Sequence, residues 1–191
     1  MRPLAVEEVR APAEYEPVRA EALRRDVERR APRAVAVGEL LSVVFENRWT
    51  VAAALEEQLR AGHVEEPARI AEEVAIFNAL IPGERELAAT VFVDVDDAAT
   101  LGRRLRELPR VVDAVHLEVG GVRVGRVAAA VQGLAGEGES VRQLRFRLTE
   151  EQRAAVERGA EVVVCCDHPG HRGRTVLGEE QRRALLEDLA L

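Results

Sequence analysis

Apolar residues recur every three or four positions in several stretches of the chain, which is the spacing of one helix face. Pro32 ends the first stretch and Pro82-Gly83 ends the third. Thr149 and Gln152 have the residue types and spacing of a capping box, which predicts the start of a further helix. Together the signals predict helices over residues 14–31, 48–61, 67–81, 97–108, 149–159 and 179–189.

Other stretches are continuous apolar runs, or alternate between apolar and polar residues as strands do. They predict strands over residues 40–45, 87–95, 112–119, 122–127, 144–148 and 162–166. Gly120-Gly121 predicts a tight hairpin in which Glu118 faces Arg123 and Leu117 faces Val124.

Helices and strands are mixed along the chain, so we expect an α+β fold in which a mostly antiparallel sheet has helices packed on one face. The length of 191 residues predicts a single domain over residues 1–191. Its helical part is expected over about residues 14–81 and its sheet-rich part over about residues 87–191. Residues 132–140 are rich in glycine and predict a mobile loop.

The charge and cysteine content narrow the class of protein. The net charge is −7, which disfavours binding to nucleic acid and to anionic membranes. No apolar run is long enough to cross a membrane, and the N-terminus lacks the apolar segment of a signal peptide. Two adjacent cysteines form no disulfide framework, so we expect a cytoplasmic protein. All 27 basic residues are arginine, which excludes any chemistry that needs a lysine.

The densest group of metal-binding residue types lies at residues 165–171, at the end of a predicted strand. Along a strand Cys165 and Cys166 point to opposite faces, so Cys166 would share a face with His168, and Cys165 with Asp167. The Pro-Gly pair that follows would bring His171 back toward the strand. Thiolate, imidazole and carboxylate suit iron or zinc. The candidate metal ligands are therefore Cys166, Asp167, His168 and His171.

Two other interpretations of this segment remain open. In the first, Cys165 is a small core residue and His168 donates to a backbone carbonyl. In the second, a thiol activated by a neighbouring imidazole acts as a nucleophile. His63 and His116 have no ligand spacing to a partner, and we expect both to be solvated, with His116 on the wet face of the sheet.

A second candidate site is the corner between a strand and a helix at Glu46, Asn47 and Arg48. Arg48 could grip a carboxylate or phosphate, and Glu46 could act as a base or ligand. The alternative is a helix cap at Asn47 with a structural ion pair.

Five segments together resemble a known bacterial family, the domain of unknown function 3501. They are Phe45–Arg48, Phe77–Gly83, Glu86–Phe92, Val141–Phe146 and Asp167–Pro169, and the resemblance covers nearly the whole chain. It implies an accessory role in iron or oxidative-stress chemistry, with a rubrerythrin-like or iron–sulfur protein as partner. The chain departs from the family pattern at His171, where a tyrosine is expected, and at Cys165 and Cys166, in a strand that usually lacks cysteine.

Three hypotheses of function follow. The first is a cytoplasmic accessory protein that binds a protein partner in an iron or redox pathway. The second is a metal-dependent enzyme or metal carrier that uses the Asp-His-Pro turn with iron or zinc, and the third is a small-anion-binding domain anchored by Arg48. Neither nucleic acid nor a membrane is expected as a partner, and an exposed sheet face would allow a homodimer.

Overall fold

The computed structural model describes residues 1–95, 97–127 and 140–190. Two antiparallel sheets form the centre of the molecule, with strand orders β1-β2-β3-β7-β6 and β5-β4-β8-β9. The strands are β1 (Ala34–Val37), β2 (Leu41–Glu46), β3 (Glu86–Val93), β4 (Val115–Val119), β5 (Val122–Arg123), β6 (Gly125–Val127), β7 (Val141–Arg147), β8 (Val162–His168) and β9 (His171–Val176). The single α+β domain expected from the sequence is confirmed.

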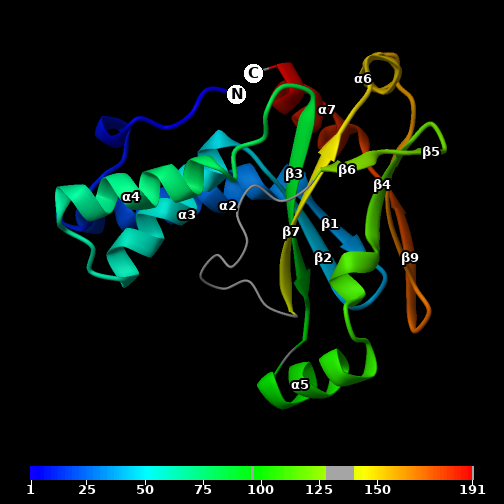
Figure 1. Cartoon of the computed structure of the whole chain (residues 1–191), viewed down its shortest axis with the longest axis horizontal. Helices are drawn as coiled ribbons and strands as arrows, with labels where there is room; N and C mark the ends of the chain where they lie inside the picture. The colour runs from blue at the N-terminus through cyan, green and yellow to red at the C-terminus, as the bar shows by residue number, and fades with distance from the viewer. Residues whose placement is uncertain (96, 128–139, 191) are drawn as a thin grey trace.

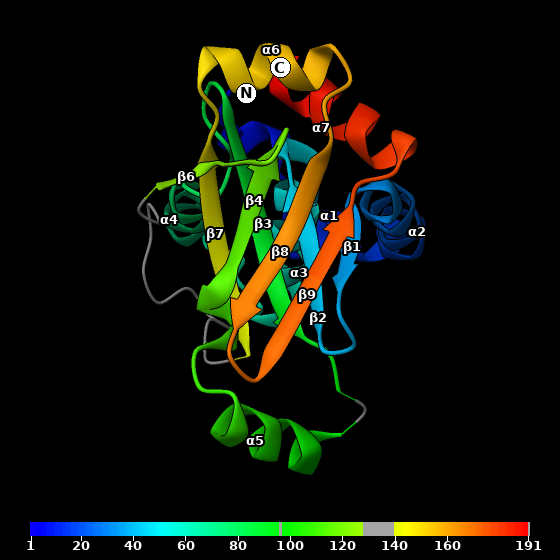
Figure 2. The same ribbon diagram turned by 90° about the vertical axis from the view of Figure 1, so that its right-hand side faces the viewer.

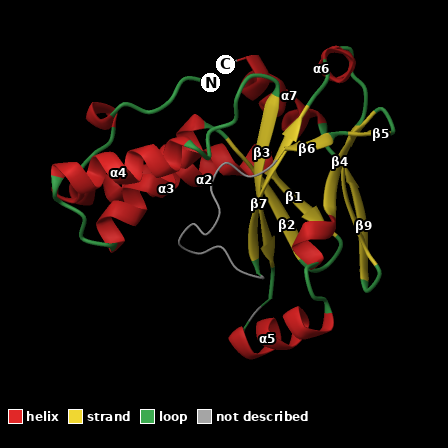
Figure 3. Cartoon of the chain, in the orientation of Figure 1, coloured by secondary structure: helices red, strands yellow, loops and turns green. Residues whose placement is uncertain are grey.

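The helices lie outside the two sheets. They are α1 (Pro12–Tyr15), α2 (Arg19–Arg30), α3 (Arg48–Ala61), α4 (Pro67–Asn78), α5 (Ala98–Glu107), α6 (Glu150–Glu157) and α7 (Glu179–Ala190). Figures 1 and 3 show α2, α3 and α4 on one side of the five-stranded sheet and the four-stranded sheet on its other side. Helix α5 lies at one end of the sheets, and α6 and α7 lie at the opposite end. None of the described helices is both long and apolar enough to cross a membrane.

The main core fills the space between the sheets. Alternate residues of the central strands point inward, among them Val43 and Val91 of one sheet and Leu117 and Val164 of the other, all at most 1% exposed. A second apolar cluster, which includes Leu55 and Leu59, joins α3 to α4 and to the N-terminal segment.

The predicted hairpin is confirmed in its register and in its turn. Glu118 pairs with Arg123, the Val124 amide donates to the Leu117 carbonyl, and Gly120 and Gly121 have φ angles of 55° and 79°. Such positive angles favour glycine at both positions of the turn.

Some elements differ from their predicted form for identifiable reasons. The predicted helix over 14–31 is divided into α1, a 3₁₀ turn and α2, because Pro17 has no amide hydrogen to continue the first segment. The predicted strand over 122–127 divides at Val124, which is 2% exposed, so β5 joins one sheet and β6 the other. Strands β1 and β9 were not predicted. Residues 132–139 of the predicted glycine-rich loop lie outside the described residues.

Candidate functional site

The segment at residues 165–171 forms the end of β8, a two-residue turn and the start of β9. As expected from strand alternation, Cys166 and Asp167 point to opposite faces. The Cys166 thiol lies in the core, 3.4 Å from the His171 carbonyl oxygen, whereas the Asp167 side chain is 68% exposed on the outer face. The structure therefore does not bring the four predicted ligands together at one point.

The imidazoles of His168 and His171 contact the backbone. His168 Nε2 lies 3.2 Å from the Pro109 carbonyl oxygen, and its Nδ1 accepts a hydrogen bond from the Gly170 amide. His171 Nε2 lies 3.0 Å from the Val37 carbonyl oxygen. These contacts correspond to the backbone-carbonyl interpretation of His168, and they connect the hairpin to its neighbours.

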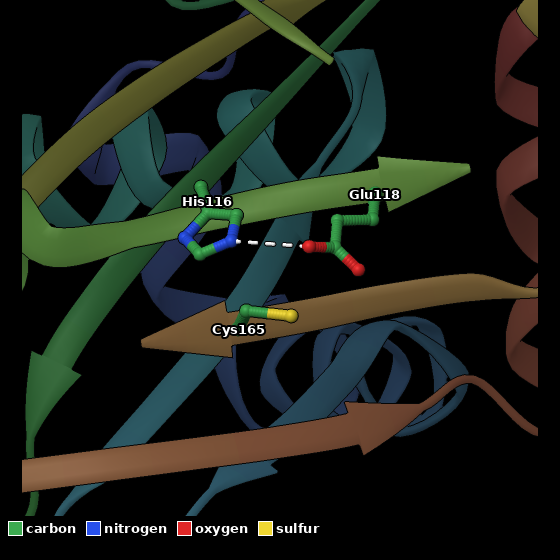
Figure 4. A group of neighbouring side chains, drawn as sticks. All are labelled: His116, Glu118 and Cys165. Atoms are coloured by element: carbon green, nitrogen blue, oxygen red, sulfur yellow. Dashed lines mark ion pairs between the residues drawn. The ribbon is translucent and has the colours of Figure 1, made fainter. Parts of the chain in front are cut away.

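A different group of metal-binding side chains converges on the outer face of the four-stranded sheet. His116 and Glu118 project from β4 and Cys165 projects from β8 (Figure 4), and one donor atom of each lies within 4.8 Å of the other two. His116 and Cys165 are directly opposite each other in the β4–β8 register. Figure 2 shows that no helix of the described residues crosses this face.

The prediction that His116 is solvated is wrong, because its side chain is 3% exposed. Cys165 lies beside His116 in the neighbouring strand. The carboxylates of Glu118 and Asp167 each approach the Nε2 atom of His116 to 3.5 Å. The alternation of His116 and Glu118 along one strand was a signal for two ligands on a shared face. The third, Cys165, depends on the pairing of β4 with β8, which no local pattern indicates.

Arg174 of β9 supplies the positive charge of this group. Its guanidinium donates to Glu118 Oε2 at 2.6 Å and lies 3.5 Å from Cys165 Sγ. The hydrogen bond from Arg174 lowers the pKa of the Glu118 carboxyl, so this carboxyl is ionised at neutral pH. Burial raises the pKa of the Cys165 thiol, so a metal ion that binds there must displace its proton.

The donor types and spacing suit a tetrahedral zinc or iron ion. With bonds of about 2.0 to 2.3 Å, the ligand atoms of such a site lie roughly 3.4 Å apart. The observed separations of His116 Nε2 from the Glu118 and Asp167 oxygens are both 3.5 Å. Imidazole, thiolate and carboxylate would then be three ligands. The exposed Asp167 carboxylate lies near His116 Nε2 but outside this group of three, so it would have to move to become a fourth.

Glu46, at the second predicted site, is engaged by neighbouring side chains. Arg30 donates to its carboxylate at 3.2 Å, Thr50 Oγ1 at 2.6 Å and Thr90 Oγ1 at 2.8 Å. These contacts join α2, α3 and β3 beneath the helices, which gives Glu46 a structural role.

Asn47 and Arg48 also have structural partners. The Asn47 side chain accepts hydrogen bonds from the amides of Trp49 and Thr50, and so caps α3. Arg48 pairs with Glu8 at 2.5 Å. The corner thus has the helix cap and ion pair of the alternative interpretation.

Comparisons with known proteins agree with the resemblance seen in the sequence. The model of the family described as protein of unknown function (DUF3501) matches residues 3–189. A crystal structure of a protein of unknown function from Burkholderia pseudomallei K96243 has the same fold, with a TM-score of 0.88 and 24% sequence identity. The match covers 98% of this chain and 100% of that one. No curated protein matches the chain.

Proposed function

We propose that this chain, which belongs to the DUF3501 family, binds a single zinc or iron ion through His116, Glu118 and Cys165. The convergence of these three donor types from two paired strands carries the proposal. Strands of a sheet hold their side chains in fixed positions, so the ligands are positioned before the metal arrives.

Arg174 is central to how such a site would load. In the structure its guanidinium contacts both Glu118 and Cys165, which are two of the three proposed ligands. A divalent ion therefore competes with a monovalent cation already in place. Its arrival would release the guanidinium and the thiol proton together, which makes binding dependent on pH.

The exposed Asp167 carboxylate suits exchange of the ion with another molecule. Its side chain is 68% exposed, whereas those of His116 and Cys165 are buried. A ligand at the surface can leave the metal and give an incoming protein group its place. The site therefore fits a metal carrier or accessory protein better than a closed structural zinc site.

A protein partner in iron or oxidative-stress chemistry, such as a rubrerythrin-like or iron–sulfur protein, is part of the same proposal. None of the described helices crosses the sheet face that carries the site, which supports a partner docking there. Cytoplasmic location is also proposed, and the two free thiols of Cys165 and Cys166 support it.

The two adjacent cysteines offer a matched test of the metal site. Both are buried, but only Cys165 faces His116. We expect chelator-treated wild-type protein to bind one equivalent of zinc in calorimetry. With cobalt it should show a sulfur-to-cobalt charge-transfer band. Cys165→Ala should lose the band and most of the zinc affinity, whereas Cys166→Ala should retain both.

Thermal unfolding without metal verifies that each variant is folded before its binding is compared. Wild-type protein that binds neither ion would contradict the proposal. So would an equal loss of the cobalt band in the two cysteine variants, because Cys166 lies on the other face of β8.

A further inference from the structure

A small cavity lies at the edge of the five-stranded sheet, away from the proposed metal ligands. It has a volume of about 270 Å³. Strands β6 and β7 form part of its wall, and Arg110 and Asp113, at the 3₁₀ turn that precedes β4, complete it. None of its lining residues is one of the proposed metal ligands, so its function is a separate question.

The charge of the cavity is unbalanced. Arg110, Arg126, Arg142 and Arg145 line it, and Asp113 is the one carboxylate among the described lining residues. Arg145 is neutralised elsewhere, by Glu86 at 2.9 Å. Among the described lining residues, three arginines therefore share a single carboxylate, although the chain as a whole has a net charge of −7.

Asp113 cannot satisfy all three guanidinium groups. Its carboxylate accepts a hydrogen bond from Arg110 Nε at 2.9 Å. Arg142 Nε lies 3.4 Å from the other oxygen, yet this nitrogen is buried and makes no hydrogen bond. Within the described part of the chain, Arg126 donates to the neutral backbone carbonyl of Asp113, at 2.9 Å. A buried donor without an acceptor costs free energy that an anionic ligand would recover.

The electrostatics of Arg126 agree with an excess of positive charge. Partial burial, together with the nearby charges of Arg123 and Arg142, lowers the pKa of this guanidinium despite the opposing effect of Asp113. A positive group is therefore held where its neighbours disfavour it. An anion in the cavity would remove this penalty.

We infer that this cavity binds the phosphate group of a small phosphorylated molecule or free phosphate, through Arg110, Arg126 and Arg142. Guanidinium groups match phosphate oxygens in a fork, and a phosphate near neutral pH carries close to two negative charges. The volume is below the range of about 300 to 1,000 Å³ of pockets for drug-sized ligands, so the ligand is small.

Calorimetric titration of the full chain tests this inference. Inorganic phosphate and glycerol 3-phosphate are the two probes, in buffer with EDTA so that no metal-bound phosphate contributes. We expect saturable binding of at least one probe by the wild-type protein. Arg126→Gln and Arg142→Gln should each weaken it about tenfold or more, because each removes charge-assisted hydrogen bonds.

Two further variants distinguish the cavity from general charge attraction. Arg69→Gln removes one exposed positive charge from α4 and should leave the affinity unchanged. Asp113→Asn should strengthen binding, because it removes the carboxylate that competes for the arginines.

The probe with the higher affinity identifies the class of ligand, either free phosphate or a phosphate ester. No saturable binding of either probe would overturn the inference. An equal loss in Arg69→Gln, or no gain in Asp113→Asn, would also overturn it. Failure here would leave the metal proposal intact, since the titrations contain EDTA and the sites share no residue.

Discussion

At the scale of single residues, Arg174 controls the proposed metal site. It bridges Glu118 and Cys165, at 2.6 Å from the Glu118 carboxylate and 3.5 Å from the Cys165 sulfur. In the metal-free protein the guanidinium stabilises the carboxylate. A divalent ion that takes Glu118 and Cys165 as ligands must displace these guanidinium contacts, so Arg174 competes with the metal for the same two side chains.

Replacement of Arg174 by alanine is therefore expected to raise zinc affinity by about tenfold, because the metal no longer has to displace a charge-assisted hydrogen bond from Glu118. Competition with a chromophoric zinc chelator measures the change. Arg153→Ala, which removes an arginine paired with Glu157 on α6, is the matched control and should bind zinc as the wild type does. Weaker binding by Arg174→Ala would show that the guanidinium holds the ligands in place rather than competing with the metal.

At the scale of elements, strands β1 and β9 join the edges of the two sheets. Instead of pairing with another strand, the outer carbonyls of β1 accept side-chain hydrogen bonds. The Ala36 carbonyl accepts from Thr175 at 2.6 Å, and the Ala34 carbonyl accepts from Gln181 at 2.6 Å. The two edges are thereby protected from pairing with another chain. His171 is part of this junction, because its Nε2 atom contacts the Val37 carbonyl oxygen. This contact explains the position of the His171 side chain better than a role as a metal ligand does.

The junction needs a glycine at position 173. A Cβ atom there would lie 2.8 Å from the Gly38 amide nitrogen and 2.9 Å from the Val37 carbonyl carbon. Gly173→Ala should lower the free energy of unfolding by about 1 to 3 kcal/mol, because backbone must move. Denaturant unfolding measures this loss.

Gly102→Ala in α5 is the control, because its Cβ would meet only Arg106 at 3.5 Å. A helix gains stability of about 0.5 to 1 kcal/mol from this change. Equal effects of the two substitutions would contradict the close approach of β9 to β1.

At the scale of the whole molecule, a buried ionic group joins the C-terminal helix α7 to the first 50 residues of the chain. Asp188 of α7 accepts hydrogen bonds from Arg33 at 2.7 and 3.0 Å and from Asn47 at 2.9 Å. Arg33 precedes β1 and Asn47 caps α3, so the N-terminal helical region and the C-terminal helix meet at one carboxylate.

Removal of this carboxylate should be costly, since it leaves a buried guanidinium without its partner. Asp188→Ala is expected to lower the free energy of unfolding by about 3 to 5 kcal/mol. The neighbouring Glu187→Ala removes an exposed carboxylate from the same helix and should change it by less than about 0.5 kcal/mol. Chemical denaturation followed by circular dichroism measures the free energy of unfolding of both variants. Similar small losses in the two variants would show that Asp188 does not stabilise the contact of α7 with Arg33 and Asn47.

The sequence alone determined the features that depend on neighbouring residues. The hairpin at Gly120-Gly121, the Thr149 capping box, the asparagine cap at Asn47 and the opposite orientations of Cys165 and Cys166 all follow from local turn chemistry and strand alternation. Periodicity of the apolar positions likewise predicted most of the helices and the α+β class.

Only the tertiary structure decided which strands lie side by side. Strand β9 alternates half-buried with exposed residues, and its one large apolar residue, Val176, is exposed, so no apolar period marked it. The pairing of β4 with β8 joins residues about 50 positions apart. That pairing is selected by the free energy of burying both sheets against each other, which no local window contains. The proposed metal ligands and the arginine cavity both depend on such distant contacts, and for that reason neither was predicted from the sequence.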